Sequence, residues 1–196
     1  MDSTNDLDQN IQFFFRKPED LDDTEKIYSI LFLLRRDIKT CFGINPNDNS
    51  KITYEALFPG VMAIMAGIDL LAKFYHGNDT TQNGEVGKRF KNYVKIYLVN
   101  KNEDEAKIIY QLRNSLLHSF GLYSEDRNGN IYKFILNRSA TFIHKVDKEN
   151  YKISIIELQK KFEDSIDKYE KELCADFNLQ NNFVKMFPKY RALKIQ

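Results

Sequence analysis

The chain has 196 residues, 42% of them hydrophobic, and its mean hydropathy is −0.51. These values exclude a disordered chain and are typical of one soluble globular domain, here 1–196, with a sizeable core. The formal net charge is +1, which excludes a strongly basic nucleic-acid-binding domain. The charge is uneven, because Met1–Lys26 has a net charge of −5 and leaves +6 for the remainder. This excess predicts either a modest basic surface or ordinary solvated Lys side chains.

The cysteines and the apolar segments limit the cellular setting. Cys41 and Cys174 fit neither a metal-binding spacing nor a disulfide framework, so we expect reduced thiols, no metal and no cofactor. Met1–Asn10 is polar and acidic, unlike a signal peptide. The apolar run Ala56–Ile68 is too short to span a bilayer. A cytoplasmic protein without a membrane contact is predicted.

The first part of the chain should form a frayed start and two helices. In Met1–Pro18 we expect only Phe13-Phe14-Phe15 to dock, onto the rest of the protein or onto a partner. Apolar periodicity predicts helices over about Leu21–Phe42, ending at Gly43, and over about Tyr54–Tyr75. The second helix should be central, because its apolar residues alternate spacings of four and three.

Asp69 is the one acid inside the apolar part of that second helix. A buried carboxylate needs a cation or hydrogen bonds. Lys73 lies four residues further on and is the local candidate. Arg113, far away in the sequence, is the alternative.

A third helix over about Val86–Leu98 carries several basic residues near Tyr side chains. Such a group could hold an RNA strand, and a solvated helix face is the alternative interpretation. The basic residues are Lys88, Arg89, Lys91 and Lys95.

The following helix has clear end signals. Asn102 with Glu105 forms a capping box, and Gly121 suits the left-handed conformation just past a helix end. One face is apolar, and Arg113, Asn114 and His118 lie off it. Asn114 and His118 project about 40° apart, and the long Arg113 side chain can reach round the helix. A guanidinium, a carboxamide and an imidazole thus share one region, and a phosphodiester site uses such groups.

The pattern Arg113-Asn114-x3-His118 near the end of a bundle helix resembles the Arg-x4-6-His motif of the HEPN superfamily. The resemblance covers roughly Asp20–Phe120 plus the last helix, and a polar residue after the Arg is common in ribonuclease members. It implies a metal-independent endoribonuclease in which two subunits place their Arg/His sets in one cleft. It also implies a homodimer and a role in defence or toxin–antitoxin systems.

One further match to the family pattern and one departure from it also bear on the interpretation. The spacing from Arg138 to His144 also fits, but it lies in a strand-like stretch without a polar residue after the Arg, so we interpret it as accidental. Toxin members paired with nucleotidyltransferase antitoxins often carry a Tyr two residues after the motif His. Phe120 stands there instead, so nucleotide transfer onto that position is not supported.

After Gly121 the apolar period changes to two. A hairpin with an Asn128-Gly129 turn, extended by strands at Ala140–Val146 and Tyr151–Ile153, would form a small antiparallel meander over about 121–153. It could form a wall or lid of the site. Ser154 with Glu157 should cap a long helix that reaches about Asp176.

The C-terminal tail, about 178–196, contains several aromatic residues and should hold a short helix ending before Pro188. Exposed aromatic side chains there would mark a surface for a protein partner. The fold prediction is therefore mainly α: an up-and-down bundle of four or five helices, with the meander inserted before the last long helix.

Two functions remain open. In a ribonuclease, His118 would accept the 2′-hydroxyl proton or protonate the leaving oxygen, Arg113 would stabilise the phosphorane, and Asn114 would orient the phosphate or the imidazole. In a non-catalytic dimerisation or partner-binding module, the same three residues would hold helices together.

Overall fold

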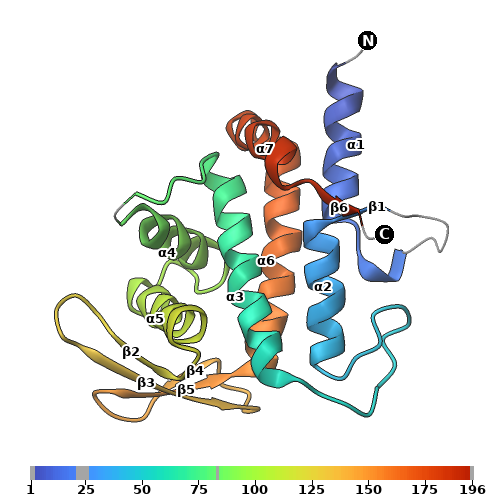
Figure 1. Cartoon of the computed structure of the whole chain (residues 1–196). Coiled ribbons are helices and arrows are strands. Elements are labelled where there is room, and N and C mark those ends of the chain that lie inside the picture. Colours follow the sequence, from blue (N-terminus) through green and yellow to red (C-terminus); the bar gives the residue numbers. More distant parts are fainter. Residues whose placement is uncertain (1–2, 21–26, 83, 195–196) are drawn as a thin grey trace. The chain divides into compact units, whose positions relative to one another are not determined.

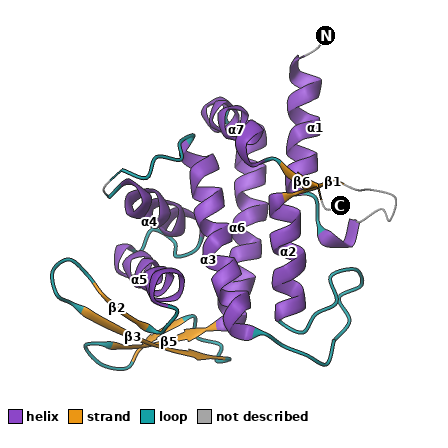
Figure 2. Cartoon of the chain, viewed as in Figure 1, coloured by secondary structure: helices purple, strands orange, loops and turns teal. Residues whose placement is uncertain are grey.

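The computed structural model describes residues 3–20, 27–82 and 84–194, and this part of the chain is mainly helical (Figures 1 and 2). It contains seven α-helices, a four-stranded sheet and a two-stranded sheet. The contacts divide the chain into two compact units. Unit 1 comprises Met1–Gly67, Lys73–Asp79 and Glu170–Gln196, and unit 2 comprises Ile68–Ala72 and Thr80–Tyr169.

Unit 1 joins the two ends of the described chain. It contains α1 (Ser3–Phe15), the 3-10 helix η1 (Pro18–Asp20), β1 (Ile27–Ser29), α2 (Ile30–Cys41), α7 (Phe177–Tyr190) and β6 (Ala192–Lys194), together with most of α3 (Leu57–His76). Strands β1 and β6 pair antiparallel. The frayed start was a wrong prediction, because residues before Phe13 form the helix α1.

An aromatic cluster forms the core of unit 1. The Phe14 ring lies 4.4 Å from the Phe74 ring and 5.6 Å from the Phe183 ring, measured between centroids. Phe14 and Phe15 are buried, which confirms the predicted docking of these side chains. Each buried Phe is worth about 2 kcal/mol of hydrophobic free energy. The cluster therefore ties α1 to α3 and α7.

Two predicted helix ends in unit 1 need correction. The helix expected from Leu21 begins only at Ile30, since the Ser29 hydroxyl accepts the Phe32 N–H at 3.0 Å and caps it there. The first residues of that prediction, 21–26, lie outside the described residues. Helix α7 runs through Pro188 to Tyr190, because a Pro in the last turn costs one hydrogen bond while neighbouring Phe183, Met186 and Phe187 are buried.

The apolar residues Val61, Ile64, Ile68 and Leu71 of α3 are fully buried. Pro59 lies in its first turn, where a missing N–H is tolerated. By length and composition α3 is long and apolar enough to cross a membrane, in contrast to the prediction from the shorter apolar run. However, 56% of its most apolar window is buried inside the protein, as in a core helix.

In unit 2, α4 (Glu85–Tyr97) packs on α5 (Glu103–Ser119), and α5 lies against a small sheet (Figure 1). The sheet consists of β2 (Tyr123–Glu125), β3 (Ile131–Asn137), β4 (Ile143–Lys145) and β5 (Asn150–Ser154), and α6 (Ile155–Ala175) follows it. Helices α3 and α6 contribute residues to both units. The predicted caps of α5 and α6 are confirmed, because Asn102 accepts the N–H groups of Asp104 and Glu105, and Ser154 accepts that of Glu157.

The sheet is mixed, so the predicted antiparallel meander was wrong. The strand order is β2-β3-β5-β4, and β3 pairs parallel with β5 while the other two pairs are antiparallel. Strand β5 buries Tyr151 and Ile153 and takes the inner position, whereas β4 is short and largely exposed and stays at the edge. The segment between β3 and β5 is long enough for the crossover that a parallel pair requires.

Candidate functional site

Arg113 of α5 forms an ion pair with Asp69 of α3 inside unit 2. Its Nη2 lies 2.8 Å from Asp69 Oδ2, and the two side chains are 10% and 18% exposed. Arg113 is thus confirmed as the partner of Asp69. The alternative candidate, Lys73, belongs to unit 1, where its ammonium lies 4.7 Å from the centroid of the Tyr190 ring.

The same guanidinium holds the other two predicted site residues. Arg113 Nη1 lies 2.6 Å from His118 Nε2 and donates to Asn114 Oδ1 at 3.3 Å. Because a guanidinium only donates, Nε2 accepts and the imidazole carries its proton on Nδ1. His118 is exposed and Asn114 is half-buried. The structure therefore brings Asp69, Arg113, Asn114 and His118 together, with a buried ion pair at one end and an exposed imidazole at the other.

The end of α5 fixes this arrangement. Phe120 adopts the left-handed conformation, with φ 50°, where Gly121 was expected to do so. The N–H groups of Phe120 and Gly121 both point to the Ser115 carbonyl oxygen, which closes the last turn one residue earlier than the Gly predicts. His118 consequently lies in the final turn, next to solvent.

Two polar atoms of the cluster are buried without a hydrogen-bond partner in the described structure: Asp69 Oδ1 and Arg113 Nε. Leaving such an atom unpaired costs about 1–3 kcal/mol. Unsatisfied buried groups are rare in native proteins and mark strained or functional places. The ion pair is therefore held in position by the packing of its helices as well as by its own bonds.

A groove of about 560 Å³ runs beside the cluster, and we call it the α4–α5 groove. Its walls come from α4, α5 and the turn between β2 and β3, and Asn114 lies at its boundary. The residues that line it are Gly84, Gly87, Lys88, Lys91, Lys107, Tyr110, Gln111, Asn114, Glu125, Asp126, Arg127 and Asn128.

The predicted RNA-binding residues divide between this groove and other places. Lys88 and Lys91 line the groove. Arg89 is buried and donates from Nη1 to the Thr80 carbonyl oxygen at 3.2 Å. Lys95 forms an ion pair with Glu103. The four residues therefore do not act as one basic face.

Two basic residues of the groove, Lys107 and Arg127, were missed. Lys107 precedes Asn114 by seven residues, so helical spacing alone would have placed them on one face of α5. Arg127 lies in the β2–β3 turn, and no local pattern of the sequence relates that turn to α4.

Lys107 and Asp126 neutralise each other, with 2.8 Å between Nζ and Oδ2. The bond to Lys107, followed by that from Asn130, holds the pKa of Asp126 well below its usual range. The bonds to Asp126 and Tyr132 raise the pKa of Lys107. Both groups stay charged at neutral pH, and their pairing attaches the β2–β3 turn to α5.

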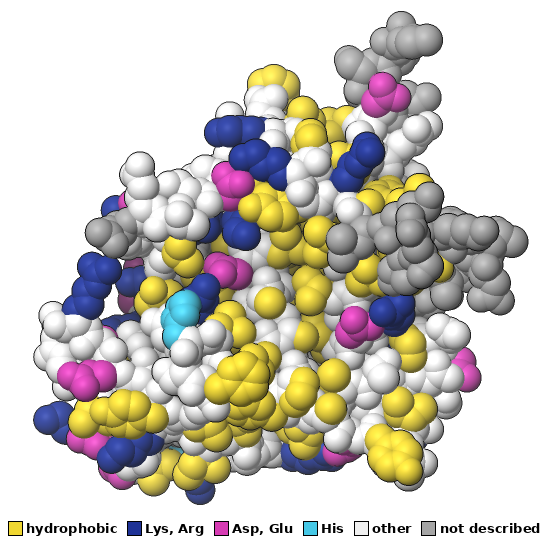
Figure 3. Space-filling model, in the orientation of Figure 1, with side chains coloured by type: hydrophobic (Ala, Val, Ile, Leu, Met, Phe, Trp, Pro, Cys, Tyr) yellow, Lys and Arg dark blue, Asp and Glu magenta, His cyan; other side chains and the backbone are white. Residues whose placement is uncertain are grey.

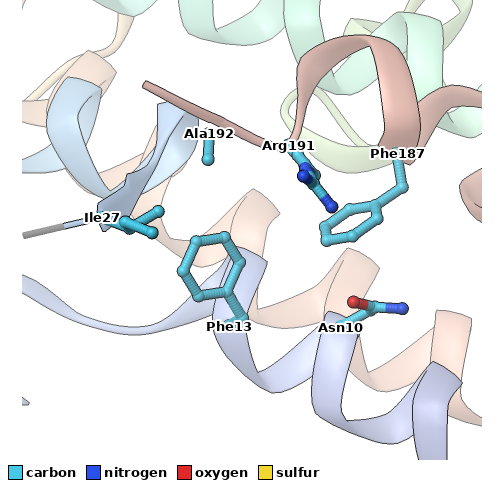
Figure 4. Close-up of a pocket in the computed structure, with 6 residues that line it drawn as sticks. All are labelled: Asn10, Phe13, Ile27, Phe187, Arg191 and Ala192. Carbon is cyan, nitrogen blue, oxygen red and sulfur yellow. The ribbon is translucent and has the colours of Figure 1, made fainter. Parts of the chain in front are cut away.

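A second cavity, of about 390 Å³, lies in unit 1 between α1, β1, α7 and β6 (Figure 4). Asn10 and Arg191 add polar groups to mostly apolar walls, which include Phe13, Ile27 and Phe187. The described residues of this lining include no pair of acid and base groups. On the face drawn in Figure 3, Lys and Arg side chains are scattered among acidic and hydrophobic ones.

Comparison with protein-family models, with curated proteins and with solved structures gives no match to this chain. The geometry of the site residues therefore has to support any functional assignment.

Proposed function

We propose that this protein is a metal-independent endoribonuclease of the HEPN type, with Arg113, Asn114 and His118 as its catalytic residues. One observation carries the proposal: an exposed imidazole accepts a hydrogen bond at 2.6 Å from a guanidinium that Asp69 fixes. Imidazole is the side chain that exchanges protons near neutral pH, and guanidinium is the planar cation suited to phosphate oxygens. The motif resemblance points to the same chemistry.

The reaction is an internal transfer within RNA. The 2′-oxygen attacks the adjacent phosphorus, the bond from that oxygen to phosphorus forms, and the bond from phosphorus to the 5′-oxygen breaks. A base accepts the 2′-hydroxyl proton and an acid gives a proton to the 5′-oxygen, so the products are a 2′,3′-cyclic phosphate and a 5′-hydroxyl. The Nε2 lone pair of His118 is suited to the base role.

Substrate binding has to change the bond between Arg113 and His118. A phosphate oxygen is a better acceptor for Arg113 Nη1 than a neutral imidazole, because charge-assisted hydrogen bonds are stronger. When the oxygen replaces Nε2, the imidazole is released to exchange a proton with the substrate. Asn114 uses Oδ1 for Arg113, which leaves its Nδ2 group to donate to the phosphate.

A single imidazole cannot be base and acid in the same step, so the proposal includes a homodimer in which two Arg/His sets share one cleft. It further includes the up-and-down helical bundle around α5, a cytoplasmic location, and a role in a defence or toxin–antitoxin system. The homodimer and the biological role rest on the motif resemblance, the bundle also on apolar periodicity, and the location on the polar N-terminus and the short apolar run of the sequence.

The test is cleavage of single-stranded RNA in the presence of EDTA. His118→Ala and Arg113→Ala should each lower the cleavage rate by about 100-fold or more, the usual effect of losing a general acid or base. His144→Ala is the matched control, because His144 is exposed on β4 of the same unit and should leave the rate unchanged. Equal rates for all four proteins, each shown to be folded, would remove the ribonuclease.

A second function is a non-catalytic dimerisation or partner-binding module. The observation that favours it is that Arg113 directs Nη1 and Nη2 to other side chains of the protein, Asn114, His118 and Asp69. In this case the cluster serves to hold α5 against residues 68–72 of α3. The same substitutions would then lower the melting temperature without any effect on RNA.

A further inference from the structure

We propose that the α4–α5 groove binds a single-stranded segment of RNA and leads it to His118, with Lys91, Arg127 and Tyr110 as the contacts. This inference rests on the proposed function, since it assigns a path to the substrate of the same site. It differs from the sequence interpretation, which placed the RNA on one face of α4.

The first argument is the position of the groove along α5. Lys107, Gln111, Asn114 and His118 follow one another at spacings of four, three and four residues, so they share one helix face. The first three line the groove, and His118 lies one turn beyond its end. From Lys107 to Asn114 the helix rises about 10 Å, and about 6 Å more to His118. At about 3.4 Å per stacked nucleotide, the groove accepts about three nucleotides.

The second argument is the charge of its walls. Lys88 pairs with Glu85 at 2.8 Å, and Lys107 pairs with Asp126, so each of these two cations already has an acidic partner in the protein. Lys91 on α4 and Arg127 on the β2–β3 turn supply the remaining positive charge from two different walls. A phosphate backbone running between them would be contacted from both sides.

The third argument is an aromatic ring in the groove. Tyr110 lies half-buried beside Lys91, whose ammonium is 5.7 Å from the ring centroid, and 5.8 Å from the Phe90 ring. Gly87 leaves room for the Tyr110 side chain, because a Cβ at residue 87 would lie 2.7 Å from the Tyr110 hydroxyl oxygen. Aromatic side chains between basic residues are the usual platform for unpaired bases.

Glu125 also lines the groove, and its carboxylate opposes a phosphate. This acid provides a test with the opposite sign. Neutralising it should strengthen RNA binding, whereas a groove that takes a basic or neutral ligand would lose affinity or stay the same.

The experiment measures binding of a labelled uridine oligonucleotide of about twelve nucleotides by fluorescence anisotropy, over a series of salt concentrations. The full chain carries His118→Ala, so the RNA is not cleaved. Adding Lys91→Glu with Arg127→Glu should weaken binding by at least about tenfold and lower the salt slope by about two. Lys148→Glu with Lys160→Glu, exposed positions of unit 2 outside the groove, makes the same charge change and should bind like the parent. Glu125→Gln should bind more tightly.

The outcomes separate this inference from the ribonuclease. If Lys91→Glu with Arg127→Glu binds RNA as tightly as Lys148→Glu with Lys160→Glu, the groove is not the RNA-binding site, even if wild type cleaves RNA. If only Lys91→Glu with Arg127→Glu loses RNA binding, the result supports the α4–α5 groove as the RNA-binding site, even if wild type does not cleave RNA. Binding of an acidic peptide such as polyglutamate without binding of RNA would overturn it in favour of a protein partner.

Discussion

Nη1 of Arg113 lies 2.6 Å from Nε2 of His118, and the guanidinium is itself paired to Asp69. A proton on Nε2 and the hydrogen bond from Arg113 exclude each other, because both groups would then donate. The imidazole is thus coupled to a buried ion pair. This coupling distinguishes the cluster from three independent polar side chains on a helix surface.

The contributions of Asp69 and Arg113 to the free energy of unfolding should be strongly coupled. Asp69→Ala leaves a largely buried guanidinium without its carboxylate, and should lower the free energy of unfolding by about 3 kcal/mol. In an Arg113→Met background the same substitution should cost much less, since no cation is left unpaired. Urea unfolding of the four proteins gives the coupling energy. Additive single effects would show that the pair contributes nothing.

The shared cleft of the proposed homodimer predicts how mixed subunits behave. If one His118 is the base and the partner's His118 is the acid, a mixed dimer is inactive. Equal amounts of wild type and His118→Ala, unfolded and refolded together, should then keep about a quarter of the activity. Two independent sites would keep about half. The measurement is the initial cleavage rate as a function of the mixing ratio.

Much of the fold was predictable because its signals are local. Asn102 and Ser154 cap helices wherever they occur before such sequences, and the Asn128-Gly129 turn is fixed by Gly129 at φ 76°. The strand order was not predictable. Strand β5 lies beside β3 and buries Tyr151 and Ile153, and this burial depends on residues far away in the sequence. The helix α1 was missed because its polar start hides the spacing of its buried residues.

In the candidate site too, the local features were predictable and the long-range contacts were not. Asn114 and His118 were placed on one side of a helix from their spacing, and helical geometry alone was sufficient. The choice between Lys73 and Arg113 for Asp69 needed the packing of α3 against α5. Arg127 belongs to the α4–α5 groove only because the pair Lys107–Asp126 attaches its turn to α5.

Gly77→Ala should be one of the most damaging single changes in unit 1. Gly77 has φ 62°, and a Cβ there would lie 2.3 Å from Asn182 Oδ1, whose amide donates to the Tyr75 carbonyl oxygen. Gly84→Ala is the control, with φ 86° and no atom of the described residues within 4 Å of the added Cβ. Both lose about 1–2 kcal/mol to the left-handed conformation, but Gly77→Ala adds a clash. The melting temperature of Gly77→Ala should therefore be several degrees below that of Gly84→Ala. Equal melting temperatures would mean that Asn182 moves freely.

The pair of Lys107 and Asp126 predicts a pH dependence. The pKa of Asp126 is lower in the folded protein than the ordinary value of about 3.9, so its contribution is complete above that pH and is lost as the pH falls below it. The pKa of Lys107 is raised, so its contribution is complete below about pH 10 and lost only above it. Asp126→Asn should therefore flatten the loss of melting temperature between about pH 5 and pH 3. Parallel curves of melting temperature against pH for wild type and Asp126→Asn would contradict a role of Asp126 in this pH dependence.

Phe120 combines an unfavourable backbone conformation with an exposed ring, two residues after His118 in the sequence. Its φ is 50° and its side chain is 76% exposed, so the left-handed conformation costs about 1 kcal/mol with little hydrophobic burial in return. Phe120→Asn should raise the melting temperature, because Asn tolerates this conformation. Strain that persists next to a candidate site indicates use of that residue, so the same variant should cleave RNA more slowly. Phe177→Asn, at a residue 74% exposed on α7, is the control and should do neither. A stabilised Phe120→Asn that cleaves at the wild-type rate would leave the ring without a role in catalysis.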